Sequence, residues 1–207
     1  MNILCHRGLW KSKDERNTIN SLVNAHNEGF GVELDLRDRG SQIVISHDFP
    51  NDKSELFDSY LNELKANNYK NNTTLAINIK ADGLTSKIQK IINEYNISNY
   101  FVFDMSNPEM LRYNNAGVNF FTRISEYEKS PILEREAMGV WLDAFNKEWY
   151  SIEDINLIVA SGKRICFVSP ELHGRVFNKQ WAMLKDMRHD DFLLCTDQAI
   201  KAKGFFR

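Results

Sequence analysis

The sequence predicts one α/β domain over residues 1–207, folded as a compact (β/α)8 TIM barrel with trimmed helices. Segments with strand spacing alternate about eight times with segments of helical spacing, a pattern typical of a parallel sheet covered by helices. No linker rich in Pro, Gly or Ser, no charge block and no internal repeat divides the chain. Its 207 residues are fewer than the roughly 250 typical of such barrels, so we expect short helices and few insertions.

An open, doubly wound sheet is the alternative architecture, because the same alternation of strands and helices builds it. Dinucleotide-binding sheets of that kind carry Gly-x-Gly-x-x-Gly after the first strand, and this sequence lacks the pattern there. We therefore favour the closed barrel, in which functional side chains gather at the carboxyl ends of the strands.

Four strands and three helices are predicted in the first half of the chain. Apolar runs predict strands at residues 2–6, 31–36, 42–47 and 73–80, and helical spacing predicts helices at 17–28, 54–66 and 85–95. Gly29 should end the first helix, since glycine accepts the left-handed conformation found at helix termini. Gly40 lies between the second and third apolar runs, so we expect a tight turn and a local hairpin there.

The alternation continues in the second half with five strands and three helices. Strands are predicted at residues 100–105, 119–124, 139–142, 164–168 and 192–196, and helices at 108–114, 152–160 and 178–187. Pro108 and Asp154 stand in the first turns of two of these helices, where both residue types are favoured. Residues 126–136 are charged and only weakly patterned, and residues 199–207 follow the last strand.

The composition is that of a soluble globular protein and argues against several partners. A formal net charge of −2, without a basic run that contains aromatics, argues against nucleic acid. No apolar segment approaches the ~20 residues of a membrane span, so we expect no stable membrane insertion. Cys5, Cys166 and Cys195 each lie in an apolar run, as buried free thiols of a reducing compartment do. The amino terminus lacks the features of a signal peptide, and we expect a cytoplasmic protein.

Two carboxylates stand out in the second predicted strand. Glu33 and Asp35 are two residues apart, so both point to one face of the strand, while Leu34 and its apolar neighbours take the other. Adjacent carboxylates repel each other unless a cation or a proton lies between them. Their hard oxygens suit Mg²⁺ or Ca²⁺. Zinc is disfavoured, because the chain has no Cys-x-x-Cys and no His-x-x-x-His.

Almost every predicted strand ends in a polar or charged side chain. These residues are His6, Arg7, Glu33, Asp35, His47, Asn78, Lys80, Asp104, Arg123, Asp143, Glu171 and Asp197. Arg7 and Lys80 are cations that would hold an anion, most simply a phosphate. His6 and His47 are able to act as general base and general acid near neutral pH. A metal ion, two cations and two histidines fit in-line displacement at phosphorus better than hydride or acyl transfer.

Four short motifs follow one another in the first fifty residues. They are His6-Arg7-Gly8, Asn17-Thr18, Gly31-x-Glu33-x-Asp35 and Val44-x-x-His47-Asp48. In order and spacing they resemble the signature of the glycerophosphodiester phosphodiesterase family. Later in the chain, Trp141-Leu142-Asp143 is similar to phosphodiesterase-like proteins of bacterial surface-polysaccharide loci.

The resemblance implies a (β/α)8 barrel with a divalent cation on the Glu-x-Asp pair. It also implies two catalytic histidines, of which one activates a substrate hydroxyl to attack phosphorus and the other protonates the leaving oxygen. Carried over to this sequence, catalysis falls to His6 and His47, and phosphate contact to Arg7 and Lys80.

The chain departs from the family pattern at the third metal ligand. The family usually has a Glu two residues before the Lys, whereas this sequence has Asn78 before Lys80. An Asn carbonyl still binds Mg²⁺ or Ca²⁺, with one negative charge fewer. Either the metal is held more weakly or another carboxylate helps, and Glu171 and Asp104 are the candidates. The usual insertion after the third strand is also absent, which indicates a compact, divergent member.

The function that the sequence favours is a metal-dependent phosphodiesterase, a phosphoric diester hydrolase. Its partner is a small glycerophosphodiester-like or sugar-linked substrate, from lipid metabolism or polysaccharide biosynthesis. A catalytically silent phosphate-binding barrel and a phosphodiester lyase that forms a cyclic phosphate are the alternatives. An aldolase or isomerase on the same barrel stays open as well, since a fold does not fix its chemistry. The oligomeric state does not follow from the sequence.

Overall fold

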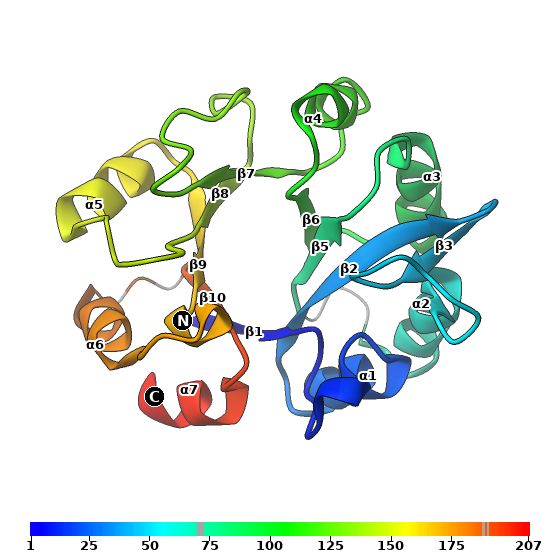
Figure 1. The fold of residues 1–207 in the computed structure, drawn as a ribbon, viewed down its shortest axis with the longest axis horizontal. Helices are drawn as coiled ribbons and strands as arrows, with labels where there is room; N and C mark the ends of the chain where they lie inside the picture. The colour runs from blue at the N-terminus through cyan, green and yellow to red at the C-terminus, as the bar shows by residue number, and fades with distance from the viewer. Residues whose placement is uncertain (70–72, 188, 190) are drawn as a thin grey trace.

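The computed structural model describes residues 1–69, 73–187, 189 and 191–207, and it contains a ring of strands surrounded by helices (Figure 1). The strands of the ring are β1 (Asn2–His6), β2 (Gly31–Arg39), β5 (Leu75–Ile79), β6 (Tyr100–Phe103), β7 (Phe121–Ile124), β8 (Gly139–Leu142), β9 (Arg164–Val168) and β10 (Leu193–Thr196). Consecutive members pair in parallel, and β10 pairs with β1.

The ring closes between β6 and β7 through a single parallel bridge. Val102 pairs with Phe120, and the Val102 N–H donates to the Asn119 carbonyl at 2.9 Å. Every strand of the ring therefore has a neighbour on both sides. This confirms the predicted (β/α)8 barrel, and the open-sheet alternative does not apply.

Helices cover the outside of the ring (Figure 1). They are α1 (Ile19–Asn27), α2 (Phe57–Ala66), α3 (Thr85–Tyr95), α4 (Asn107–Asn115), α5 (Ile152–Ala160), α6 (Asn178–Met187) and α7 (Ala199–Phe205). Two short 3-10 helices, η1 (Lys13–Glu15) and η2 (Pro170–His173), lie after β1 and β9. The connection from β7 to β8 has no helix, which agrees with the weak pattern over residues 126–136.

A hairpin extends one side of the barrel. Beyond Leu36, β2 pairs in antiparallel fashion with β3 (Gln42–Ile45), and β3 pairs with the short β4 (Glu55–Leu56). The turn at Gly40 has a φ of 63°, a conformation that glycine adopts without strain. The predicted hairpin is thus confirmed. The loop from β3 to β4 lies near the loop after β1, since both loops line one cleft.

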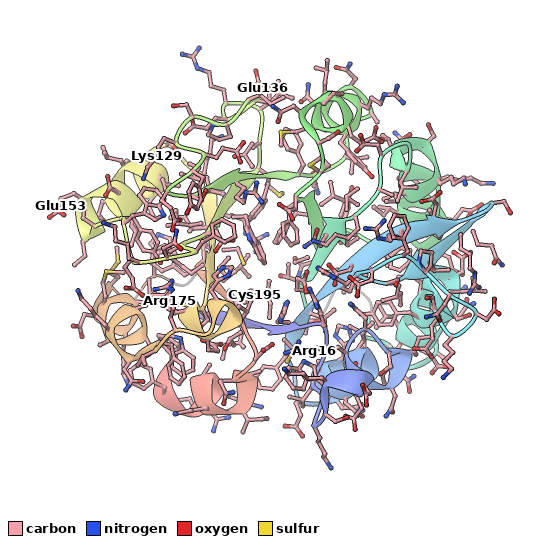
Figure 2. The ribbon with its side chains drawn as sticks, in the orientation of Figure 1. Arg16, Lys129, Glu136, Glu153, Arg175 and Cys195 are labelled. Carbon is pink, nitrogen blue, oxygen red and sulfur yellow. The ribbon has the colours of Figure 1, made fainter. Side chains whose placement is uncertain are left out.

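The barrel interior contains a cluster of apolar side chains. Figure 2 labels one member of this cluster, Cys195, among the strands of the ring. Leu4, Ala76, Phe101, Phe103, Phe121, Trp141, Cys166, Val168, Leu193 and Cys195 form one buried cluster. All three cysteines are free and buried, as predicted, and burial raises the pKa of each thiol. Because this cluster fills the centre, polar side chains find room only where the strands end. Among the described residues, no helix has the length and apolar character needed to cross a membrane.

Candidate active site

The carboxyl ends of β1, β2 and β5 bring the predicted site residues together. Glu33 and Asp35 point into the barrel and are buried, because alternation along β2 turns Leu34 toward the helices. The strand register sets Asp35 beside Asn78 of β5 and Glu33 beside His6 of β1. Glu33 and Asp35 therefore lie next to His6 and Asn78 in the folded barrel.

The oxygens of Glu33, Asp35 and Asn78 form a buried cluster. The Asn78 side chain donates to Glu33 Oε1 at 3.4 Å, whereas Asp35 Oδ1 and Asn78 Oδ1 accept no hydrogen bond. Burial, and next the neighbouring Asp35 charge, raise the pKa of Glu33 to about 7. Buried oxygens without donors favour a hard cation. In the described part of the chain, no three His, Cys, Asp or Glu side chains are grouped as metal ligands, and Asn78 supplies the third side-chain oxygen of this cluster.

Two cations lie against Asp35. Arg7 Nε is 2.9 Å from its Oδ2, and Lys80 Nζ is 3.6 Å from its Oδ1. The Asn17 side chain donates to Oδ2 at 2.8 Å. Arg7 has a φ of 58°, which turns its N–H toward Glu33 Oε2 at 3.2 Å. The backbone at Arg7 is therefore strained, and strain in a non-glycine residue often marks a functional site.

His6 is held in one orientation by a carboxylate. Its Nδ1 lies 2.7 Å from Asp197 Oδ1, and Arg16 donates to the other oxygen of Asp197 at 3.0 Å. Its Nε2 lies 3.9 Å from Glu33 Oε2 and so faces the oxygen cluster. The sequence indicates Asp197 only as a polar residue at a strand end, and it does not indicate Arg16. The position directly after the last strand is the sequence signal for Asp197.

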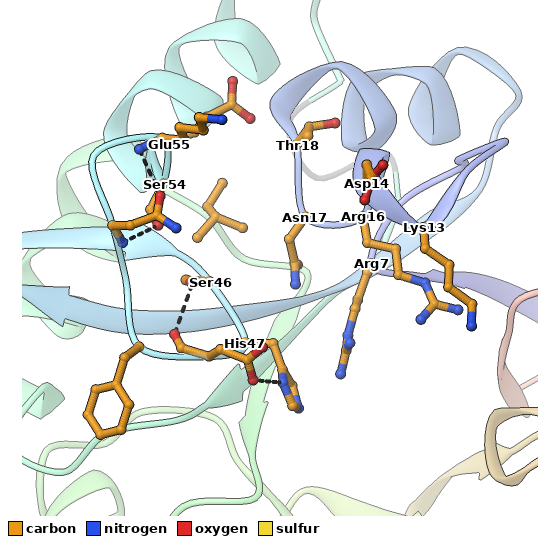
Figure 3. Close-up of a pocket in the computed structure, with 15 residues that line it drawn as sticks. Arg7, Lys13, Asp14, Arg16, Asn17, Thr18, Ser46, His47, Ser54 and Glu55 are labelled. Carbon is orange, nitrogen blue, oxygen red and sulfur yellow. Dashed lines mark hydrogen bonds and ion pairs between the residues drawn. The ribbon is translucent and has the colours of Figure 1, made fainter.

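His47 lies on a cleft beside the barrel mouth (Figure 3). The cleft has a volume of about 680 Å³ and is lined by the loop after β1 and the loop between β3 and β4. His47 is 43% exposed, and its Nδ1 lies 2.8 Å from Asp48 Oδ1. Arg7, Lys13 and Arg16 line the facing wall. His47 and Arg7 thus share one cleft.

Glu171 and Asp104, the two carboxylates considered as additional metal ligands, make hydrogen bonds and ion pairs with other residues. Glu171 accepts hydrogen bonds from the Ser169 and Thr196 hydroxyls and from the Asp197 N–H at 3.2 Å. Asp104 lies 2.6 Å from Arg123 and 3.4 Å from Lys80. Neither carboxylate is brought to the cluster of Glu33, Asp35 and Asn78.

The comparisons with known proteins give matches in structure. No protein-family model matches the chain, and no curated protein matches its sequence. A glycerophosphodiester phosphodiesterase from Agrobacterium tumefaciens has a TM-score of 0.69 at 14% identity, covering 99% of this chain and 98% of that one. A phosphodiesterase from Oleispira antarctica, in complex with the product sn-glycerol-3-phosphate, has a TM-score of 0.65 at 15% identity, over 99% and 96% of the two chains. A Ca²⁺-dependent phosphatidylinositol-specific phospholipase C from Streptomyces antibioticus has a TM-score of 0.64 at 12% identity, over 100% and 96%.

These likenesses define the class of the fold, which is the (β/α)8 barrel of phosphodiesterases and phospholipases C. The chain shares this fold with the two phosphodiesterases and the phospholipase C over nearly its whole length. The resemblance carried by the first fifty residues is therefore confirmed at the level of the fold.

Proposed function

We propose that the protein is a metal-dependent phosphodiesterase, a divergent and compact member of the glycerophosphodiester phosphodiesterase family. It hydrolyses a small glycerophosphodiester-like or sugar-linked phosphodiester with a hydroxyl group next to the phosphate. One observation carries the proposal: the buried oxygens of Glu33, Asp35 and Asn78 share the barrel mouth with Arg7 and Lys80. The likeness in fold and the four early motifs support the same chemistry.

Glu33, Asp35 and Asn78 would hold a divalent cation, Mg²⁺ or Ca²⁺, through their side-chain oxygens. Such an ion, when bound, polarises a phosphoryl oxygen and lowers the pKa of a nearby hydroxyl. The residues fit it, because Asp35 Oδ1 and Asn78 Oδ1 are buried without a hydrogen bond. Glu171 is the fourth ligand that the sequence favours, and it would join the set by exchanging some of the three hydrogen bonds that it accepts for the cation.

Arg7 and Lys80 are the proposed phosphate-binding residues. Both are now paired with Asp35, and Lys80 also with Asp104. A phosphodiester that enters the mouth would compete for the two cations with its own anionic oxygens. The planar guanidinium of Arg7 suits two phosphate oxygens at once, and Lys80 adds a point charge.

His6 is the proposed general base and His47 the proposed general acid. Because Asp197 accepts from Nδ1 of His6, Nε2 is left to take the proton of a substrate hydroxyl. The hydroxyl oxygen bonds to phosphorus while the bond from phosphorus to the leaving oxygen breaks. His47, held at Nδ1 by Asp48, gives a proton to that leaving oxygen. The products are an alcohol and a cyclic phosphate, which water opens in a second step.

The proposal also includes the cellular compartment and the source of the substrate. Three buried free thiols suit a reducing compartment, so we place the protein in the cytoplasm. Phosphodiesters from lipid metabolism and from polysaccharide biosynthesis both have the chemistry that the site requires.

A panel of phosphodiesters tests the proposal. Glycerophosphodiesters and sugar-phosphate fragments are assayed with Mg²⁺, Ca²⁺ and Mn²⁺, and we expect turnover that a chelator abolishes and a divalent cation restores. His6→Ala should remove turnover while the far-UV circular dichroism stays unchanged. Phosphorus NMR of the products separates a hydrolase from a lyase that stops at the cyclic phosphate. Full turnover in His6→Ala would contradict the role given to His6.

A catalytically silent phosphate-binding barrel is the second candidate. It is favoured by the ion pairs that Asp35 makes with Arg7 and Lys80, which neutralise this carboxylate without a metal, and by the neutral Asn78. Calorimetric titration with Ca²⁺ and Mg²⁺ separates the candidates. If no divalent cation binds at millimolar concentration, with or without a phosphodiester, the silent barrel is favoured.

A further inference from the structure

A third histidine–carboxylate pair lies after β8 and β9, and the reaction proposed above does not use it. Asp143 follows β8 directly, and its side chain is 7% exposed. Its Oδ1 accepts the Ala144 N–H at 2.8 Å and lies 2.7 Å from Nε2 of His173. When the imidazole is neutral, the Nε2–H donates to this carboxylate and Nδ1 is an acceptor. The side chain of His173 is 23% exposed, and its Nδ1 meets no hydrogen-bond partner among the described residues.

An aromatic ring stands beside this imidazole. The ring centroid of Phe145 is 4.7 Å from that of His173, and the guanidinium carbon of Arg123 is 5.9 Å from the Phe145 ring. The loop that carries Phe145 is fixed, because the Glu126 carboxylate accepts the N–H groups of Phe145 at 3.0 Å and Asn146 at 2.7 Å. A half-buried aromatic ring, an acceptor nitrogen and a guanidinium therefore share one surface.

This surface adjoins the proposed phosphate-binding residues. Asp104 connects Arg123 of this surface to Lys80 of the phosphate-binding pair. Its Oδ1 is 2.6 Å from Arg123 Nη1, and its Oδ2 is 3.4 Å from Lys80 Nζ. Asp104 has a φ of 65°, a conformation that costs free energy in a non-glycine residue and often marks functional sites. On the other side, Leu172, the chain neighbour of His173, packs against the apolar cluster inside the barrel.

We propose that Phe145, His173 and Arg123 form a subsite for the leaving alcohol of the substrate, the half that does not carry the attacking hydroxyl, and that this leaving alcohol is a polyol or a sugar ring. The inference rests on the proposed phosphodiesterase function and adds the chemical class of one half of the substrate. An apolar ring face packs on Phe145, as ligand rings do on aromatic side chains. Nδ1 of the neutral His173 ring accepts from one hydroxyl. Arg123 pairs with Asp104 through Nη1 and with Glu128 through Nε, and its remaining N–H groups donate to another hydroxyl. A plain alkyl alcohol offers neither group a partner.

Two diesters that differ only in one alcohol test the subsite. Glycerophosphoinositol carries a polyol, and glycerophosphoethanol carries an alkyl group without a free hydroxyl. In His173→Ala we expect KM for glycerophosphoinositol to rise about tenfold while kcat changes less than about threefold, since one hydrogen bond to substrate is lost. Kinetics on glycerophosphoethanol should stay within about twofold, and Phe145→Leu should act in the same direction. His189→Ala is the control, because this imidazole stacks on Phe192 and contacts none of the subsite residues.

Binding without turnover separates the subsite from the proposed reaction. Calorimetry on His6→Ala measures the affinity for both diesters, and adding His173→Ala should weaken glycerophosphoinositol binding about tenfold and leave the ethanol diester unchanged. If the wild-type protein hydrolyses neither diester but shows this selective loss, the subsite stands and the proposed activity fails. An equal loss for both diesters, or no loss for either, overturns the subsite even where turnover is normal.

Discussion

Asp197 holds the imidazole ring of His6 in one orientation. Its Oδ1 lies 2.7 Å from Nδ1 of His6, and its Oδ2 accepts from Arg16 at 3.0 Å. Because an amide offers an N–H as well as an oxygen, Asp197→Asn allows the other tautomer of the ring. We expect kcat to fall by about 10²- to 10⁴-fold with little change in KM. Steady-state kinetics on the best diester of the panel check this.

The matched control for Asp197→Asn is Asp186→Asn, which changes an exposed carboxylate on α6. It should leave kcat within about twofold of wild type, as expected for a surface substitution. If Asp197→Asn also stays within that range, His6 does not depend on Asp197 for its orientation.

Asn78 determines how much negative charge faces a cation in the oxygen cluster. Asn78→Asp has nearly the same shape and adds a third carboxylate beside Glu33 and Asp35. We expect Ca²⁺ to bind at least about tenfold more tightly, since affinity follows the charge of the ligands. Without the cation, the added buried charge should lower the free energy of unfolding by about 1–3 kcal/mol. Calorimetric titration and urea unfolding, with and without Ca²⁺, measure the two effects.

Asn24→Asp is the control for this substitution, because Asn24 is exposed on α1. It adds the same charge outside the barrel and should change neither quantity appreciably. Unchanged Ca²⁺ affinity in Asn78→Asp would show that Asn78 does not face the cation.

The local part of the site could be predicted from the sequence, and the long-range part could not. Alternation along residues 31–36 is enough to set Glu33 beside Asp35, and the structure confirms that both face inward. The orientation of the Glu171 side chain depends on the path of η2 after β9. Its carboxylate accepts hydrogen bonds from Thr196 and Asp197 at the end of β10. The contact between Asp197 and His6 spans 191 residues, so no spacing pattern indicates it.

At the scale of elements, one buried histidine joins α1 to α2. Nε2 of His26 is 2.6 Å from the Tyr60 hydroxyl, and Nδ1 is 2.8 Å from Thr73 Oγ1. Burial lowers the pKa of His26 from 6.5 to about 4. Between these values the unfolded chain binds a proton that the folded chain does not, so stability falls as the pH falls.

We therefore expect the free energy of unfolding to drop by about 3 kcal/mol between pH 6.5 and pH 4 on account of His26, at roughly 1.4 kcal/mol per pH unit. Urea unfolding at intervals from pH 7.5 to pH 4 gives the slope. His26→Gln removes this titrating group and should change the slope by that amount relative to wild type. Glu33, whose raised pKa acts in the opposite direction over the same pH range, is present in both proteins. His47→Ala changes an exposed histidine and should leave the slope as in wild type. Equal slopes in wild type and His26→Gln would contradict the assignment.

Hydrophobic periodicity predicts where the helices and strands lie. Their ends depend on capping and pairing contacts, which periodicity does not predict. The bounds of α3, α5, α6, β8 and β9 agree with the prediction residue for residue. The helix expected from residue 17 begins at Ile19, because the Thr18 side chain caps it by accepting the Ser21 N–H. The helix expected from residue 54 begins at Phe57, because residues 55–56 pair with β3 instead.

For the whole molecule, the junction of β6 and β7 is the part of the ring with least strand pairing. One bridge joins Val102 to Phe120 there, whereas β10 and β1 are joined by four residue pairs. Two interior rings cross the junction, since Phe101 of β6 stacks on Phe121 of β7 with centroids 3.7 Å apart. Closure of the barrel at this point therefore depends on interior packing more than on backbone hydrogen bonds.

Phe121→Ala tests this dependence. Phe121 is fully buried, so the substitution should lower the free energy of unfolding by about 3–5 kcal/mol through lost contacts and a cavity. Phe57→Ala removes a similarly buried ring at the start of α2 and should cost a similar amount. Native-state hydrogen exchange distinguishes the two variants: the Val102 amide, which bonds to Asn119 across the junction, should lose protection selectively in Phe121→Ala. If the Val102 amide and the amides between β1 and β10 lose protection equally in both variants, the interior stack does not hold the ring closed.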